Sequence, residues 1–110
     1  MKKLFLLTLV GMVSITIGCA SVMVTKTGKG YFEPTNPNEV EILVTVPMHA
    51  YTELATVVTQ NWKVKHTAKM HNSLRSKCAP LGADAVVLGD SGIAPNGKFW
   101  ASGVAIQYND

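Results

Sequence analysis

Charged residues and cysteines are both scarce in this chain of 110 residues. Only 15% of the residues are charged, and no run of five or six like charges occurs, which excludes a basic tail for nucleic acid. The two cysteines, Cys19 and Cys78, allow one disulfide at most. No internal repeat or low-complexity segment is present in the sequence. These absences, together with the length, leave room for one small domain.

The first 18 residues have the pattern of a secretory signal. Lys2 and Lys3 precede an apolar run over residues 4–17, which is shorter than the roughly 20 residues of a membrane-spanning helix. A short permanent anchor is the alternative. Removal of this segment would leave eight Lys and Arg against seven Asp and Glu, so the formal charge would fall from +3 to about +1. A mature chain of that charge does not favour a nucleic-acid partner.

The stretch TIGC, residues 16–19, resembles the lipobox of bacterial lipoproteins. In that family of signals the cysteine thiol receives a diacylglycerol, and a peptidase then cuts the chain before the cysteine. Gly18 is the small residue that the peptidase requires, while Thr16 stands where leucine is usual. The resemblance implies that residues 1–18 are a lipoprotein signal peptide and that Cys19 is the lipidation site.

The residues after Cys19 bear on where the protein resides. Ala20 stands where an aspartate would retain a Gram-negative lipoprotein in the inner membrane, so the resemblance implies an outer-membrane lipoprotein that faces the periplasm. Two or three acyl chains would anchor it stably. Residues 25–30 are polar and residues 33–38 contain two prolines, which together predict a flexible tether over residues 19–38. A short strand over residues 21–24 is the alternative for part of it.

Residues 39–110 carry the patterns of a small folded domain. Alternating or continuous apolar residues predict four strands, at residues 39–46, 53–60, 84–89 and 99–108. In the first of these, one buried face would be formed by Val40, Ile42, Val44 and Val46. The last strand has large residues at even positions and small ones at odd positions, and its small face is made of Ala101, Gly103 and Ala105. That small face could accept a closely packed helix.

One helix is predicted between the second and third strands, over residues 64–79. Its buried stripe would consist of Val64, Ala68, His71, Leu74 and Cys78. Pro80 should end it, and Gly82 is placed for a left-handed turn. Asn96-Gly97 predicts a type I′ hairpin before the last strand. The expected fold is α+β, a two-layer domain in the order β-β-α-β-β with one helix packed on a four-stranded sheet.

Two segments of the domain resemble known bacterial proteins. Residues 74–87, which end in Gly-Ala-Asp-Ala-Val, are similar to a helix-to-strand pattern of the Rcs stress-sensor lipoprotein (RcsF), of YbjQ-like small domains and of many uncharacterised lipoproteins. Residues 31–43, with Asn36-Pro37 at their centre, resemble a segment that often precedes it. The resemblance implies the fold. The chain differs from the stress sensor, because it lacks the cysteines for that family's two disulfides.

Several residues could suggest catalysis or metal binding. The string Gly89-Asp90-Ser91-Gly92 occurs around trypsin-like nucleophiles, but a chain of this length cannot build that fold, so a turn is expected there. His66 and His71 would lie roughly 140° apart around a helix, and His71 lies about 10 Å along the axis from Cys78, which excludes a shared metal or a thiolate–imidazole pair. We therefore expect a buried thiol and a half-buried histidine, and no catalytic, cofactor or metal residues.

The leading interpretation is a non-enzymatic lipoprotein, held in the membrane by acylated Cys19, whose domain presents a surface to an envelope protein in sensing or structure. The alternative is an oligomeric domain of YbjQ-like type that binds a small ligand or a metal. The sequence does not set the oligomeric state. A basic helix face is expected to be solvated, with contact to anionic lipid heads or peptidoglycan as its alternative, and consists of Lys65, Lys69 and Lys77.

Overall fold

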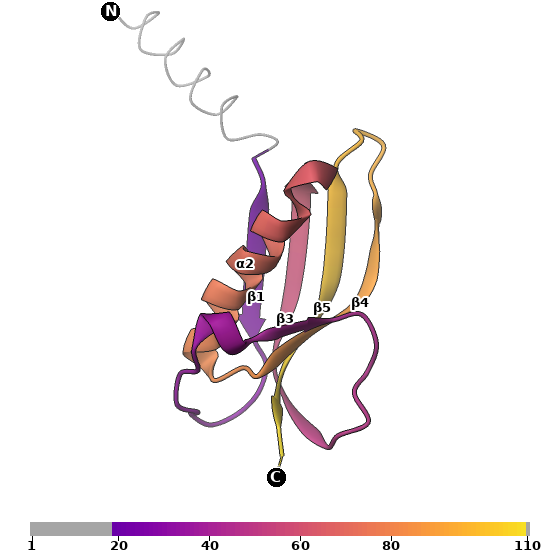
Figure 1. The fold of residues 1–110 in the computed structure, drawn as a ribbon. Helices are drawn as coiled ribbons and strands as arrows, with labels where there is room; N and C mark the ends of the chain where they lie inside the picture. The colour runs from indigo at the N-terminus through magenta and orange to yellow at the C-terminus, as the bar shows by residue number, and fades with distance from the viewer. Residues whose placement is uncertain (1–18, 110) are drawn as a thin grey trace, which may run out of the picture.

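In the part of the chain that the structure describes, one helix lies against one face of a five-stranded sheet (Figure 1). The computed structural model describes residues 19–109, so the predicted signal peptide lies outside the described residues. The strands are β1 (Ser21–Lys26), β2 (Glu41–Leu43), β3 (Tyr51–Trp62), β4 (Ala85–Ile93) and β5 (Phe99–Tyr108), and the helix is α2 (Thr67–Cys78). Short 3-10 turns are η1 (Pro37–Glu39), η2 (Val64–His66) and η3 (Ala79–Leu81). The predicted α+β, two-layer class is confirmed.

The predicted strand count of four is wrong, because β1 adds a fifth strand at the edge of the sheet. The order across the sheet is β1-β3-β5-β4-β2, and the chain order is β-β-β-α-β-β. β1 pairs antiparallel with β3 along its whole length, from Ser21 opposite Gln60 to Lys26 opposite Ala55. Residues 21–26 thus belong to the sheet and not to a tether. Val22 is buried and packs in the main core.

The rest of the expected tether also contacts the domain. Phe32 packs against the core, the Thr35 backbone N–H donates to the Ala79 carbonyl at 2.9 Å, and the Thr35 hydroxyl donates to the Ala83 carbonyl. The Asn36 side chain caps η1 by accepting from the Asn38 backbone N–H, at 3.0 Å. These contacts use the turn-forming pair Asn36-Pro37 and bring the chain to the edge of the sheet at β2.

β2 is much shorter than the strand predicted over residues 39–46. It pairs in parallel with β4 over only three positions, from Glu41 opposite Ala85 to Leu43 opposite Val87. Val40 is buried beneath α2, but Val44 and Val46 are 78% and 66% exposed. Alternation alone does not distinguish a half-buried strand from an apolar loop, because a strand also needs a partner along its length.

The buried side of α2 differs in part from the predicted stripe. Met70, Leu74 and Cys78 are fully buried at four-residue spacing, whereas Val64 is 56% exposed and Ala68 is exposed. His71 is half-buried, as expected. The helix begins after η2, so the first predicted turn does not face the sheet. The shift moves Met70 into the core, where its sulfur accepts a hydrogen bond from the buried Thr59 hydroxyl, at 3.2 Å.

The end of α2 is as predicted. Ala79–Leu81 forms the 3-10 turn η3 with Pro80 inside it, and Gly82 follows in the left-handed region at φ 90°. A Cβ at Gly82 would lie 2.6 Å from the Phe32 Cβ, so the position also requires close approach. Ala83 is fully buried in the core that α2 covers, which lets the chain enter β4 close to the helix, while the buried Ala85 faces the other side of the sheet.

β4 continues past the predicted end of its strand. Asp90, Ser91 and Gly92 are strand residues and not a turn, and a bulge lies between Leu88 and Asp90. The turn lies farther on, where the Gly97 N–H donates to the Ala94 carbonyl, at 2.9 Å. Among residues 19–109 the only non-glycine with positive φ is Asn61. The hairpin is therefore not type I′, because proline at the first central position fixes a negative φ.

β5 has the predicted bounds and the predicted difference between its faces. Ala101 and Ala105 are fully buried in the core that α2 covers. Ile106 lies on the opposite face, in a smaller cluster with Ala85 and Val87. No helix among residues 19–109 covers that second face. None of the helices in this range has both the length and the apolar character that crossing a membrane requires.

Candidate functional site

Cys19, the predicted lipidation site, is exposed and lies just before the chain enters the sheet. Only Ala20 separates it from β1. Its backbone carbonyl accepts a hydrogen bond from the Asn61 side-chain amide, at 3.4 Å. The carbonyl of Ser21, the first residue of β1, accepts a hydrogen bond from the Trp62 indole N–H, at 3.0 Å. Hydrogen bonds from the last residues of β3 therefore hold Cys19 and the start of β1 in place.

The backbone conformation of Asn61 accompanies its hydrogen bond to Cys19. It has φ 64° and lies where the register between β3 and β5 shifts, between Thr59 and Trp62. Asparagine tolerates the left-handed region better than most residues, because its short polar side chain can bond locally. Its side chain donates to Cys19 and accepts from the Asn96 amide at 3.5 Å. Its signal in the sequence is an asparagine inside a β-rich run.

Cys78, the second cysteine, is buried on the inner side of α2 and forms no disulfide. Burial raises the pKa of its thiol to about 11. Burial, and then the charge of Arg75, lower the pKa of the half-buried His71. The expectation of a buried thiol and a half-buried histidine is confirmed. Residues 19–109 contain no group of three or more His, Cys, Asp and Glu that could hold a metal ion.

Cys78 is expected to resist alkylation in the folded protein. A thiol with a pKa of about 11 is almost wholly protonated at a pH of about 8, and the thiolate is the reactive form. Iodoacetamide should leave the Cys78 peptide unmodified in buffer and modify it fully in denaturant, as measured by peptide mass spectrometry. Rapid modification in buffer would show that the helix opens away from the sheet.

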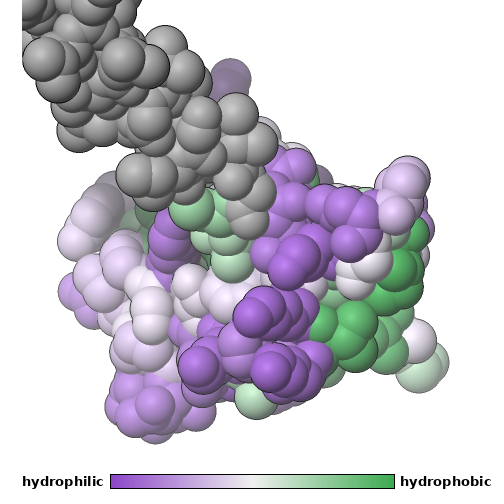
Figure 2. Space-filling view, turned by 90° about the horizontal axis from the view of Figure 1, so that it is seen from above, coloured by the Kyte–Doolittle hydropathy of each residue, from purple (hydrophilic) through white to green (hydrophobic). Residues whose placement is uncertain are grey.

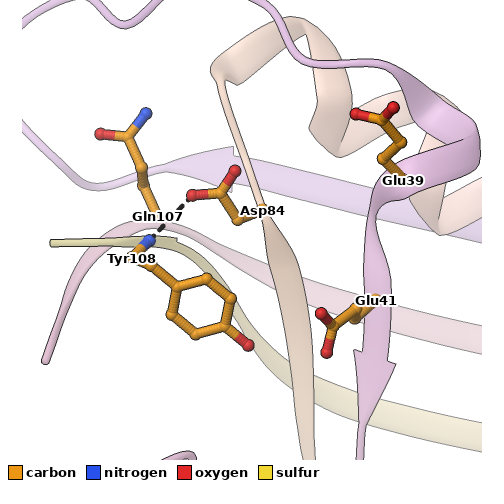
Figure 3. A pocket seen from close by; sticks show the side chains of 5 residues that line it. All are labelled: Glu39, Glu41, Asp84, Gln107 and Tyr108. Carbon is orange, nitrogen blue, oxygen red and sulfur yellow. Dashed lines mark hydrogen bonds between the residues drawn. The ribbon is translucent and has the colours of Figure 1, made fainter. Parts of the chain in front are cut away.

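An acidic hollow lies at the end of the sheet away from Cys19 (Figure 3). Its volume is about 600 Å³, and it is lined by Glu39, Glu41, Asp84, Gln107 and Tyr108. Asp84 accepts a hydrogen bond from the Tyr108 backbone N–H, at 2.9 Å. Desolvation, followed by the charges of Glu41 and Asp84, raises the pKa of the Tyr108 hydroxyl. The carboxylates come from separate segments that β2 and β4 bring together.

A shallow apolar groove occupies the face of the sheet that α2 leaves uncovered. It has a volume of about 190 Å³ and is lined mainly by Val46, Val87, Val104 and Ile106, with Tyr51, Glu53, Gly89 and Gly103. The neighbouring loop after β2 exposes Val44, Val46 and Met48. Neither hollow was predicted, because each combines residues that are far apart in the sequence and meet only through the pairing of β2, β4 and β5.

The string Gly89-Asp90-Ser91-Gly92 lies in β4 and has no visible catalytic arrangement. The Asp90 carboxylate accepts from the Ser91 backbone N–H at 3.0 Å. His49, the remaining histidine, packs its ring against Tyr108 at 5.2 Å between centroids, and its Nδ1 lies 3.0 Å from the Ala50 carbonyl oxygen. These contacts hold a strand residue and the loop before β3 in place and bring no nucleophile, base and acid together.

Comparison with known proteins shows a similarity in fold. No protein-family model matches the chain, and a search of curated proteins finds no similar sequence. Among solved structures, the chain is similar to the crystal structure of a Francisella virulence factor, FvfA, in its orthorhombic form. The TM-score is 0.57 at 14% sequence identity, over 79% of this chain and 97% of that chain. At that identity the similarity concerns the α+β fold alone.

Proposed function

We propose that the protein is an outer-membrane lipoprotein, acylated on Cys19 after removal of residues 1–18, with a small non-enzymatic interaction domain that faces the periplasm. It would serve envelope sensing or envelope structure by binding another envelope protein. The proposal joins two independent features of the chain: the lipobox-like stretch that ends at Cys19, and a folded domain that begins directly after it.

The position of Cys19 carries the proposal. A peptidase that cuts before Cys19 removes no residue of the sheet, since β1 begins at Ser21. The side chain is exposed, which is consistent with a modification at this position. Acyl chains on this residue would hold the domain on a membrane, because each buried CH₂ contributes about 0.8 kcal/mol.

The uncovered face of the sheet is the surface that we assign to protein binding. It combines the groove between Val46 and Ile106 with the exposed side chains of Val44 and Met48. A solvent-exposed apolar groove on a small domain is typical of a binding surface. The groove is open and shallow and has few polar groups, which suits contact with another protein better than catalysis.

Partition between a detergent phase and water tests the anchor. The mature protein from a membrane fraction should enter the phase of a clouding detergent, because acyl chains dominate its distribution. A matched chain that begins at Ala20 behind a cleavable secretory signal should remain in the aqueous phase. Equal distribution of the two forms would contradict the proposed anchor.

The YbjQ-like alternative is an oligomeric domain, and the same apolar groove is the observation that favours it. Light scattering of the soluble chain without the acyl group separates the two. An oligomer that the substitution Val104→Glu converts to monomer would support this alternative, since Val104 lines the groove. A monomer with no bound metal would exclude it.

A further inference from the structure

We propose that the end of the domain next to Cys19 docks on anionic phospholipid, so that the domain stands directly on the membrane in one orientation. The anchor end is defined by Cys19 and four lysines: Lys63, Lys65, Lys69 and Lys98. The proposal rests on the proposed acylation of Cys19 and extends it, by assigning a partner of stated chemistry to a surface of the folded domain.

The four lysines come from two parts of the chain that the sheet brings together. Trp62 pairs with Phe99, so Lys63 and Lys98 flank the same position of the β3–β5 ladder. Lys65 lies in η2 and Lys69 in the first turn of α2, which follow directly. Lys98 is half-buried and the other three are exposed.

The same four lysines all lie close enough to His66 to affect its pKa. Burial, and then the positive charges of Lys69, Lys65, Lys63 and Lys98, lower the pKa of its imidazole. No acidic residue lies in the first turn of α2 to offset these charges. The start of a helix is also the positive end of its dipole, where carboxylates are normally favoured. Positive charge therefore accumulates at the anchor end, and an anionic surface would relieve the repulsion.

The attachment of Cys19 places these lysines at the lipid surface. Only Ala20 links Cys19 to β1, and an extended residue spans at most about 3.6 Å. The hydrogen bond from Asn61 to the Cys19 carbonyl holds that link against β3. The anchor end thus stays within the roughly 10 Å over which charges act at moderate salt. A domain on a long tether would not be held in this way.

Figure 2 looks onto the anchor end and shows hydrophilic side chains gathered there, with hydrophobic residues along one side. Two large apolar side chains belong to this region by sequence and register. Val64 lies between Lys63 and Lys65 and is 56% exposed, while Ile93 pairs with Phe99 and is 57% exposed. Lysines around exposed aliphatic residues suit the head-group region of a membrane, where both kinds of contact are available.

At the opposite end of the sheet, the edge formed by β2 and β4 carries the acidic residues Glu39, Glu41 and Asp84, while Lys26 lies across the sheet on β1. Glu41 pairs with Ala85 at the start of β4, whereas Ile93 at its other end pairs with Phe99. The acidic hollow therefore lies at the end remote from the anchor. An anionic membrane would attract one end and repel the other, which fixes the orientation and leaves the acidic hollow facing the periplasm. Lys77 takes no part, because its ammonium group donates to the Val22 carbonyl at 2.7 Å.

Chemical acylation of the lysine amines by a reagent, with the protein bound to vesicles, tests the docking. The full mature lipoprotein is inserted from detergent into preformed vesicles, either zwitterionic or containing about one-third phosphatidylglycerol. A lysine close to such a surface gains roughly a factor of five in binding. We expect the four anchor-end lysines to react at least about fivefold more slowly on anionic vesicles, as measured by peptide mass spectrometry. Lys26, the last residue of β1, and Lys29, three residues farther along the chain, should react equally on both kinds of vesicle.

Two changes should remove the protection. Raising the salt from about 0.05 to about 0.5 M shortens the screening length severalfold and should restore the reaction rates. The double variant K65Q/K69Q should lower the protection of Lys63 and Lys98 severalfold, whereas the matched variant K26Q/K29Q should leave it unchanged.

The outcomes separate this proposal from the one on which it rests. A protein that floats with neither kind of vesicle contradicts the acyl anchor. A protein that floats with both, but whose anchor-end lysines react at the same rate on both, contradicts the docking alone. Protection that appears only after addition of peptidoglycan fragments or of a second envelope protein also overturns the docking, and assigns the lysines to that partner.

Discussion

The variant Cys19→Ser is expected to accumulate as a precursor that keeps residues 1–18 and takes up no fatty acid. Serine fills the same space but lacks the nucleophilic sulfur that lipoprotein signals require for attachment of a diacylglycerol. The cut before residue 19 follows that attachment, so it should fail too. Metabolic labelling with radioactive palmitate, followed by gel electrophoresis, measures both effects, and the incorporated label should fall to background.

The matched control for this experiment is Cys78→Ala. Cys78 is buried in the helix core and forms no disulfide, so its loss should leave palmitate incorporation and processing at the wild-type level. It costs some stability, because a buried side chain is truncated. Full palmitate incorporation by Cys19→Ser, or loss of incorporation by Cys78→Ala, would contradict our assignment of the acyl group to Cys19.

The substitution Gly103→Ala is expected to destabilise the domain by about 3 kcal/mol, or to prevent folding. Gly103 lies in β5 between Val57 of β3 and Leu88 of β4. A Cβ there would overlap the Val87 carbonyl oxygen and lie 2.8 Å from the Val87 carbonyl carbon and 2.9 Å from the Leu88 Cα. These are backbone atoms at a bulge, which cannot rotate away. The midpoint of thermal unfolding should fall by on the order of 15 °C.

Gly89→Ala provides the matched control in the same bulge. An added Cβ at Gly89 has no heavy atom within 4 Å, so the same chemical change meets open space. Its effect on the free energy of unfolding should stay within about 1 kcal/mol and can be stabilising, since alanine reduces the freedom of the unfolded chain. Equal melting temperatures for the two variants would contradict the β4–β5 register described above.

The elements predicted best are those whose signals are local. β5 has its predicted bounds because a strand-forming run extends from Phe99 to Tyr108 and alternates small and large residues from Gly103 to Ile106. The end of α2 was predicted because Pro80 and Gly82 restrict the backbone wherever they occur. Cys78 was placed in the core because its spacing from Leu74 follows the period of the helix.

The elements predicted worst depend on pairing between distant segments. β1 is a strand because six residues align with β3, and residues 21–26 by themselves show only a short apolar stretch. β2 ends at Leu43 although the alternation continues, because pairing with β4 ends there. Of the anchor-end lysines, only Lys65 and Lys69 were predicted to share a face, and Lys98 joins them through the pairing of Trp62 with Phe99.

The most direct test of the account is the intact mass of the mature protein purified from membranes. We predict a chain that begins at Cys19 and is heavier than residues 19–110 by the mass of a diacylglycerol, with or without a further acyl group on the new amino terminus. Fragmentation should assign the added mass to Cys19. A chain that retains residues 1–18, or one with an unmodified Cys19, would contradict the acyl anchor and the membrane docking that depends on it.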